Sequence, residues 1–319
     1  PQGASSAGLV PPQGVSLGGG STGVTEVGTL PSPRDYPGAA YVPSQGKVYV
    51  VSGRDSSQNP TDTIYEFDPS TGNSSQIGTM SDPPGPMEFL SATAPGDGFL
   101  YTMAGHDPDL QGGSNIPDVF RIDPSDASMV KIAELPSQSD RGDACARTGD
   151  QSIIFLAEGN QAVYWIDVVA ETTGQIGSDL LQSWYVGVGE GPDGDPYRIG
   201  GKEPLGAARA DVNRADYSAD TTTQIDTMPS TRYSTSAAGF AGSTIYLPGG
   251  LEDGSYVDYI SSYDVDSLTY TSDSGIGNFP HGLAYHDVCV DKANNRFFVV
   301  GGVHEDGSTI LDTVFEVAV

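Results

Sequence analysis

Short runs of apolar and β-branched residues, alternating with polar ones, recur along most of this chain. Residues 30–80 show the pattern most clearly, with runs at 30–42, 46–55, 62–72 and 74–80 that are separated by Gly, Pro, Asn or Asp. Alternation of this kind predicts β-strands, and the residues between the runs predict tight turns. Four short strands in about fifty residues are typical of one blade of a β-propeller.

The second run of this unit, an apolar stretch that ends in glycine, occurs six times. The copies lie at 48–53, 100–105, 153–159, 197–201, 245–250 and 297–302, and their marker glycines are 42 to 54 residues apart. A third run follows most of them, at 63–68, 119–123, 163–167, 260–264 and 313–317, and the copy at 211–217 is the weakest. The repetition predicts an all-β fold, a six-bladed propeller with four antiparallel strands in each blade.

The repeat resembles the kelch motif. A Pro–Arg pair before the first strand, a Gly–Gly doublet after the second, an aromatic residue about a dozen positions later and a period near fifty all match that family. The opening pattern occurs at 30–34, 135–137 and 228–232, and the resemblance extends over about 24–319. It implies a kelch-like propeller.

The two ends of the chain suggest how the ring closes. The sequence stops within the third strand of the sixth unit, while residues 23–28 form a spare strand directly before the first unit. We expect this strand to complete the last blade, since an open sheet edge could pair with other chains; the alternative is a tail without a structural role. We therefore divide the chain into a propeller at 23–319 and a Pro/Gly/Ser-rich arm at 1–22, which either folds across its own propeller or docks on another copy.

The charge balance restricts the classes of molecule that the chain is expected to bind. Fourteen Lys and Arg stand against 42 Asp and Glu, a formal net charge of −28, which argues against binding of nucleic acid. Repulsion between so many negative charges keeps a protein soluble and is typical of an extracellular protein or of a protein on a cell or virion surface. Adaptation to a salt-rich habitat is an equally good explanation of the charge. No run of eighteen apolar residues occurs, so we expect no membrane span. Cys145 and Cys289 fall on opposite blades and are expected to remain unbridged.

The loops that lead into the first strands and out of the second strands should form one mouth of the central channel. We take the candidate ligand-binding residues from these loops: Arg34, Tyr36, Arg54, His106, Arg141, Trp184, Lys202, Arg232, Tyr233 and His304. Five of the 14 cationic residues lie there, which predicts an electropositive mouth suited to an anionic glycan. The alternative is that these arginines only tie neighbouring blades together.

An enzymatic function is the second hypothesis. A polysaccharide lyase needs a cation to neutralise a uronate carboxylate and a Tyr or His to transfer protons. Tyr285, His286 and Arg232 could supply these roles, and a sugar mutarotase on the same fold is a further alternative by analogy.

We expect no cofactor, and no nucleotide-binding or hydrolase motif is present. Calcium in the acidic turns at 107–109, 193–195, 252–254 and 305–307 is a weak alternative, as is a metal site at His281, His286 and His304. The sequence thus favours a binding or structural module, a surface or assembly component whose partners are other protein chains, copies of itself included, with an anionic glycan as the candidate ligand.

Overall fold

A computed structural model describes residues 23–80, 84–108, 114–138, 142–148, 150, 153–157, 162–177, 182–204 and 206–319. Nearly all regular structure in these ranges is β, and the helical exception among them is one 3-10 turn, η1 (Lys292–Asn294). The all-β prediction is confirmed. In the part of the chain described here, no helix combines the length and apolar character needed to cross a bilayer.

The described residues form six four-stranded antiparallel sheets, here called blades 1 to 6. Blade 1 consists of β2 (Gly38–Val42), β3 (Lys47–Val51), β4 (Thr63–Asp68) and β5 (Asn73–Thr79). Blade 2 consists of β6 (Ser91–Thr93), β7 (Leu100–Met103), β10 (Asp118–Ile122) and β11 (Met129–Glu134). Blade 3 consists of β12 (Asp143–Ala146), β13 (Ile153–Ala157), β14 (Val163–Asp167) and β15 (Thr172–Ile176).

The second half of the chain repeats this arrangement. Blade 4 consists of β16 (Gly187–Glu190), β17 (Pro196–Ile199), β18 (Asp211–Asp216) and β19 (Thr221–Thr227). Blade 5 consists of β21 (Ala238–Gly239), β22 (Thr244–Pro248), β25 (Ile260–Asp264) and β26 (Thr269–Thr271). Blade 6 consists of β28 (Asp287–Asp291), β29 (Arg296–Val300), β31 (Thr313–Ala318) and β1 (Val24–Thr29). The weakest repeat of the sequence, blade 4, therefore has all four strands.

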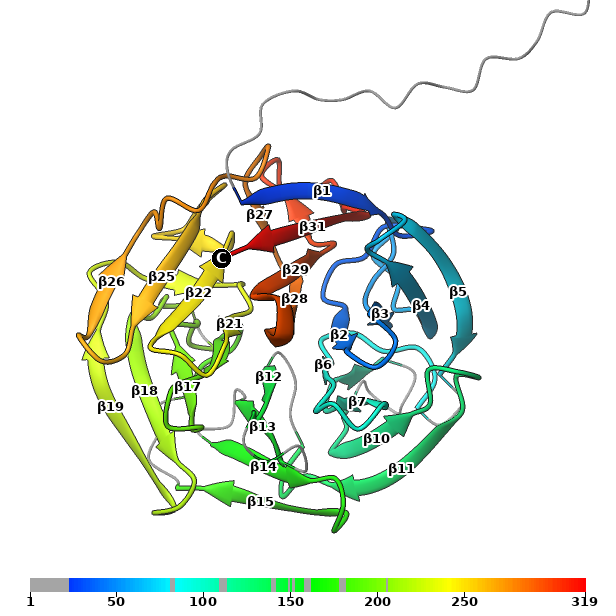
Figure 1. Ribbon diagram of the computed structural model, residues 1–319, viewed down its shortest axis with the longest axis horizontal. Coiled ribbons are helices and arrows are strands. Elements are labelled where there is room, and N and C mark those ends of the chain that lie inside the picture. The colour runs from blue at the N-terminus through cyan, green and yellow to red at the C-terminus, as the bar shows by residue number, and fades with distance from the viewer. Residues whose placement is uncertain are drawn as a thin grey trace, which may run out of the picture.

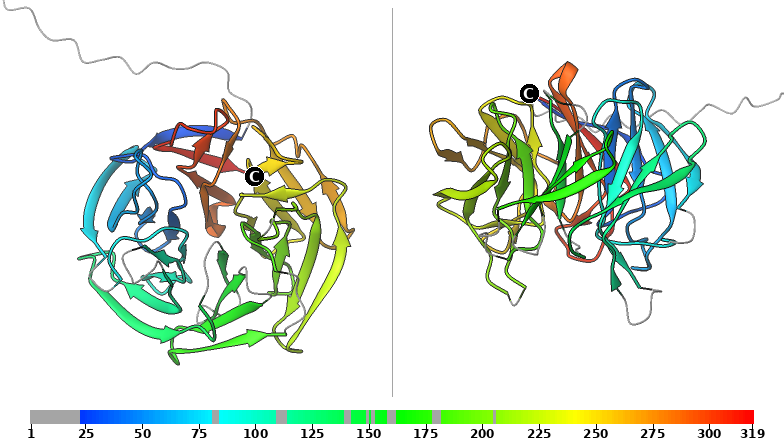
Figure 2. Two further views of the ribbon diagram at one scale, coloured as in Figure 1. Left: turned by 180° about the vertical axis from the view of Figure 1, so that it is seen from behind. Right: turned by 90° about the horizontal axis from the view of Figure 1, so that it is seen from below.

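Figure 1 shows the blades around a common centre, with β2, β6, β12, β21 and β28 innermost, and β16 is the equivalent first strand of blade 4. The side view in Figure 2 shows the blades standing next to one another around the ring. Short strands also pair within the loops. β20 (Arg232–Tyr233) and β27 (Leu283–Ala284) lie between blades, whereas the others lie between the second and third strands of a blade: β8 (His106–Asp107), β9 (Ser114–Asn115), β23 (Leu251–Glu252), β24 (Ser255–Tyr256) and β30 (Val303–His304).

The first and last strands of the chain are paired. β1 runs antiparallel to β31, from Val24 opposite Val317 to Thr29 opposite Thr313, with a bulge between Glu26 and Gly28. Val24 packs against the core between blades 5 and 6, so β1 adds apolar contacts as well as hydrogen bonds. The arm at 1–22, which we expected to contact either its own ring or another copy, lies outside the described residues.

Small residues line the axis because the inner strands converge there. Gly239 shows the constraint directly, since a Cβ at this position would lie 2.4 Å from the backbone nitrogen of Glu190 on the next blade. Farther out, large side chains fill the space between blades; Tyr49, Phe155 and Phe297 are completely buried. The tight inner layer holds the loops at the ends of the inner strands close together, and these loops form the candidate site.

Candidate functional site

Four loop residues form a hydrogen-bonded belt around part of the channel mouth, here called the mouth belt: Tyr185, Ser234, Tyr285 and Tyr36. The backbone N–H of each residue after the first donates to the carbonyl of the one before it, over 3.1, 3.0 and 2.9 Å. All four have positive φ, between 49° and 60°, as does Phe89 at 58°. Such backbone costs of order 1–3 kcal/mol for a bulky residue, so the belt is a strained and specifically braced structure.

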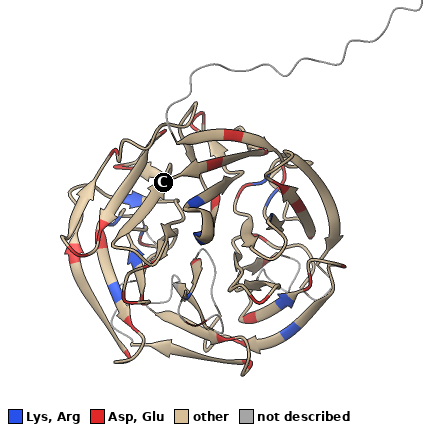
Figure 3. Cartoon of the chain, in the orientation of Figure 1, with Lys and Arg blue, Asp and Glu red and all other residues tan. Residues whose placement is uncertain are grey.

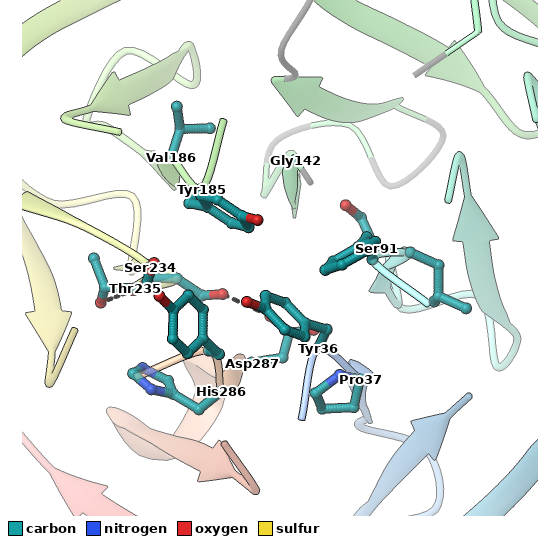
Figure 4. A pocket seen from close by; sticks show the side chains of 14 residues that line it. Tyr36, Pro37, Ser91, Gly142, Tyr185, Val186, Ser234, Thr235, His286 and Asp287 are labelled. Carbon is teal, nitrogen blue, oxygen red and sulfur yellow. Dashed lines mark hydrogen bonds between the residues drawn. The ribbon is translucent and has the colours of Figure 1, made fainter. Parts of the chain in front are cut away.

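The aromatic rings of this region pack against one another. The ring centroids of Tyr36 and Phe89 are 4.4 Å apart, and those of Tyr36 and Tyr285 are 4.8 Å apart. Tyr36 and Tyr185, from opposite blades, approach to 5.9 Å. The rings border a hollow, here called the mouth hollow, which measures about 430 Å³ when the open solvent at its entrance is included, and Figure 4 shows labelled side chains from several blades around it. Burial raises the pKa of the Tyr36 hydroxyl, which therefore stays protonated.

Two buried hydroxyl groups in the wall of this hollow have no partner among the described residues. Ser91 and Ser234 line it and are each 4% exposed. Within the described part of the chain, neither Oγ atom has a hydrogen-bond partner. Buried polar groups are almost always hydrogen-bonded in native proteins, so an orphan group calls for an explanation such as a bound water or ligand.

A pair of carboxyl groups lies at the start of two opposite inner strands. Asp287, which lines the mouth hollow, accepts from the Ala39 N–H at 2.6 Å and from Ser236 Oγ at 2.8 Å. Asp143 accepts from the N–H groups of Val188 at 2.7 Å and Ala237 at 3.1 Å. Burial raises the pKa of Asp287 to about 7, and it raises the pKa of Asp143, to which the charge on Asp287 adds.

Two of the three predicted catalytic residues line the mouth hollow, and the third does not. Tyr285 belongs to the belt, and His286 beside it is buried so completely that its pKa falls to about 3, leaving the ring uncharged. Arg232 is 0% exposed. Its guanidinium donates to the carbonyls of Leu247 and Gly249 and to Glu252, so it acts as an internal brace.

Arg34 is also turned inward. It is 2% exposed, donates to Ser32 Oγ and to the Pro33 carbonyl, and reaches Thr63 Oγ1 and the Tyr65 hydroxyl on β4 at 2.7 and 2.6 Å. Burial lowers its pKa. Arg34 and Arg232 both make internal bonds, but each holds a loop to its own blade and does not join neighbouring blades, as the alternative had it. Sequence position could not show the direction of their side chains.

Arg54 is half-buried beside the mouth and is already paired. It donates to both carboxylate oxygens of Asp35, at 3.1 and 2.6 Å, and lies 3.6 Å from Glu88. Glu88 also contacts the His106 ring at 3.2 Å. The guanidinium stacks on Tyr36, 4.5 Å from the ring centroid. Because acids balance the charge of Arg54, and Arg34 and Arg232 are internal, these three arginines do not create the electropositive mouth that the sequence predicts.

Among the described residues, five further candidates do not line the mouth hollow: His106, Trp184, Lys202, Tyr233 and His304. Lys202 pairs with Trp184 through backbone hydrogen bonds, and its Nζ lies 5.2 Å from the Tyr233 ring centroid. His304 stacks on His281 at 4.5 Å, and the described chain contains no grouping of three His, Cys, Asp or Glu that could hold a metal. Arg141 lies outside the described residues.

The acidic turns have internal roles. Asp195 pairs with Arg214 at 2.7 Å, and Asp306 accepts from the N–H groups of Ser308 and Thr309. Cys145 and Cys289 are free thiols on opposite inner strands, as expected, and both line a separate hollow of about 420 Å³.

Sequence reasoning missed part of the site: Phe89, Ser91, Asp143, Tyr185, Ser234 and Asp287. A signal does exist, because residues that begin equivalent inner segments can be aligned across blades. They are Gly38, Ser91, Asp143, Gly187, Ser236 and Asp287. The polar members of this series stand out among small and apolar neighbours.

Comparisons with known proteins agree with the architecture. The family model of the Kelch motif matches residues 36–81, which include all of blade 1. A solved structure titled "Structure of YjhT" aligns with a TM-score of 0.70 over 90% of this chain and 95% of that chain, at 15% identity. None of the curated proteins matches this sequence. The resemblance to the kelch repeat is confirmed, and a kelch-like propeller is in general a binding or structural module.

Proposed function

We propose that this chain is an extracellular, six-bladed binding module, closed by β1, that takes a carbohydrate at the mouth hollow. The observation that carries the proposal is the pair of orphan hydroxyls, Ser91 and Ser234, in a hollow bordered by aromatic rings. A sugar presents apolar C–H faces that suit aromatic rings, and hydroxyl groups that can pair with serine hydroxyls. The few polar groups of such a hollow fix the orientation of the ligand.

The belt supports binding because it holds the rings in place before a ligand arrives. Tyr36, Tyr185 and Tyr285 are fixed by backbone hydrogen bonds and by mutual ring contacts. A preorganised site loses less conformational entropy on binding. The strain at positive φ is the cost of this arrangement, and strain of this kind is concentrated at functional sites.

Ser91→Ala separates a binding role from a structural one. Removing a buried hydroxyl that has no partner should keep or raise the stability, since an unsatisfied group costs about 1–3 kcal/mol, but it should weaken glycan binding. Ser261→Ala is the matched control: its buried Oγ donates to the Ser272 carbonyl at 2.7 Å, so its loss should cost about 1 kcal/mol and leave binding intact. Thermal unfolding and a glycan array with calorimetric follow-up measure both. Unchanged binding by Ser91→Ala would remove the support for this site.

The proposed location rests on the net charge of −28, with Asp and Glu found around the whole ring (Figure 3). Detection of the protein in the culture medium or on the surface of its source cells tests it, and confinement to the cell interior would contradict it.

The proposed assembly through residues 1–22 is tested by light scattering, which compares the full chain with a chain starting at Gly23. Equal masses would exclude that role.

A lyase is the second candidate, favoured by one observation. Tyr285 and Arg54 line the same cleft beside the mouth hollow, and such a pair could transfer a proton and neutralise a uronate carboxylate. The pairing of Arg54 with Asp35 at 2.6 Å weakens this role, so binding remains our first proposal. Ultraviolet absorbance of an unsaturated uronate, after incubation with acidic polysaccharides, would establish a lyase instead.

A further inference from the structure

A second hollow lies directly beside the mouth hollow. This outer cleft, with an open volume of about 530 Å³, is lined by residues that include Arg54, Gln58, Tyr256 and Ser308. Tyr36 and Tyr285 line both hollows. Their ring centroids are 4.8 Å apart at an angle of 45°, so the two rings form a shared wall.

We propose that the outer cleft is a second subsite, which takes the neighbouring sugar unit of an oligosaccharide whose first unit lies in the mouth hollow. The inference rests on the proposed carbohydrate binding. It adds that the ligand is a chain of at least two units, which passes the wall formed by Tyr36 and Tyr285 toward the boundary between blades 1 and 6.

The groups that line the outer cleft suit a hydroxyl-rich unit. Arg54 and Asp35 lie in one planar pair, held by two hydrogen bonds of 3.1 and 2.6 Å. Asp35 is 1% exposed and balances the charge of Arg54, whose side chain is 21% exposed and presents N–H donors to the cleft. Gln58 is exposed, so its amide can pair with hydroxyl groups. Tyr256, half-buried on β24, offers an aromatic ring in the same cleft.

The shared wall is braced from several sides. The Tyr36 N–H donates to the Tyr285 carbonyl at 2.9 Å, Phe89 meets the Tyr36 ring at 4.4 Å, and Arg54 stacks on Tyr36 at 4.5 Å. A fixed wall keeps the two subsites at a constant separation. Binding of a dimer then gains a second set of contacts with little added ordering of the protein.

Calorimetry with two series of increasing chain length tests the proposal: glucose to cellotetraose, and galacturonate to its tetramer. In the series that binds, the dimer should bind at least about tenfold more tightly than the monomer. Tyr256→Ala should remove this gain and leave the monomer affinity unchanged, whereas Ser91→Ala should weaken both. Tyr256→Phe retains the ring and should retain the gain. Since Tyr256 packs on core residues, Gln58→Ala, at an exposed position, is the second variant and should reduce the gain without a change in stability.

The outcomes separate the two proposals. Equal affinities for monomer and dimer would overturn the second subsite and leave the mouth hollow as a monosaccharide site. A gain that both variants leave untouched, or a loss of monomer affinity as large as that of the dimer, would also overturn it. If neither the glycan array nor either series shows binding at any length, the proposal of carbohydrate binding fails, and the second subsite fails with it.

Discussion

Replacing Asp287 by Asn should make the protein more stable at neutral and alkaline pH. The carboxyl group accepts three hydrogen bonds, from the N–H groups of Ala39 and Val288 and from Ser236 Oγ. Its position inside the ring nevertheless raises its pKa to about 7 through loss of water. Asparagine has nearly the same shape and carries no charge, but its amide N–H₂ replaces one of the two accepting oxygens and cannot accept the bond made there, which reduces the gain.

The sign of the effect follows from proton binding. An Asp in an unfolded chain ionises near 3.9, so the folded protein holds this proton more tightly than the unfolded chain. The stability contributed by Asp287 is therefore fully present below about pH 4 and is lost as the pH rises through about 7. A gap of about three pKa units, at about 1.4 kcal/mol each, sets an upper limit of roughly 4 kcal/mol for the advantage of Asp287→Asn above pH 7.

Urea unfolding between about pH 5 and about pH 8 measures this difference through the transition midpoint and slope. The gap between wild type and Asp287→Asn should widen as the pH rises. Asp266→Asn removes the same charge from an exposed position and corrects for the general benefit of lowering the net charge of −28. If Asp287→Asn is less stable than wild type at pH 8, or shows the pH dependence of Asp266→Asn, the reasoning is wrong.

Two further perturbations test the ring. A chain that starts at Leu30 lacks β1 and leaves β31 as a sheet edge, so it should melt at a lower temperature than a chain that starts at Gly23 and should self-associate. Equal melting of these two chains would contradict closure by β1. Lys292→Met removes the cation that pairs with Glu190, whose side chain is 1% exposed, and should lower the free energy of unfolding by about 3 kcal/mol. Lys47→Met breaks a pair that is more open to solvent and should cost less than about 1 kcal/mol, so equal losses in urea unfolding would contradict the burial argument.

The strands could be predicted because their signal is local. The apolar run before Gly53 became β3, and the run before Gly302 became β29. Successive side chains of a strand point to opposite faces of the sheet in any fold, so a strand leaves an alternating apolar and polar pattern that can be read from one sequence. The weak fourth unit shows the limit: residues 211–217 carry little apolar alternation, yet β18 forms there because blades 3 and 5 frame it.

The site could be predicted only in outline. Tyr36 and Tyr285 were named from their loops and line the mouth hollow, but Arg232 was taken as a ligand contact although its guanidinium meets the Leu247 and Gly249 carbonyls within the same blade. Side-chain direction depends on which acceptors a folded neighbour provides, and no local pattern encodes it. The same holds for Ser91. Alignment of the blades marks its position as polar, but only its folded surroundings, which provide no partner among the described residues, distinguish it from a satisfied serine.

The inner positions of the ring follow a rule that explains where the hollow lies. Gly, Ser and Asp begin the inner segments of blades 1 to 3, and the same three residues begin those of blades 4 to 6. Asp143 accepts from the N–H of Val188 on the next blade at 2.7 Å, and Asp287 makes the equivalent bond to Ala39 at 2.6 Å, which joins the last blade to the first. The two halves differ at serine: Ser236 donates to Asp287, whereas Ser91 has no partner in the described chain. The positions that the two halves share stabilise the ring. Ser91 is the position at which the halves differ, and stability does not explain its serine, so we attribute it to ligand binding.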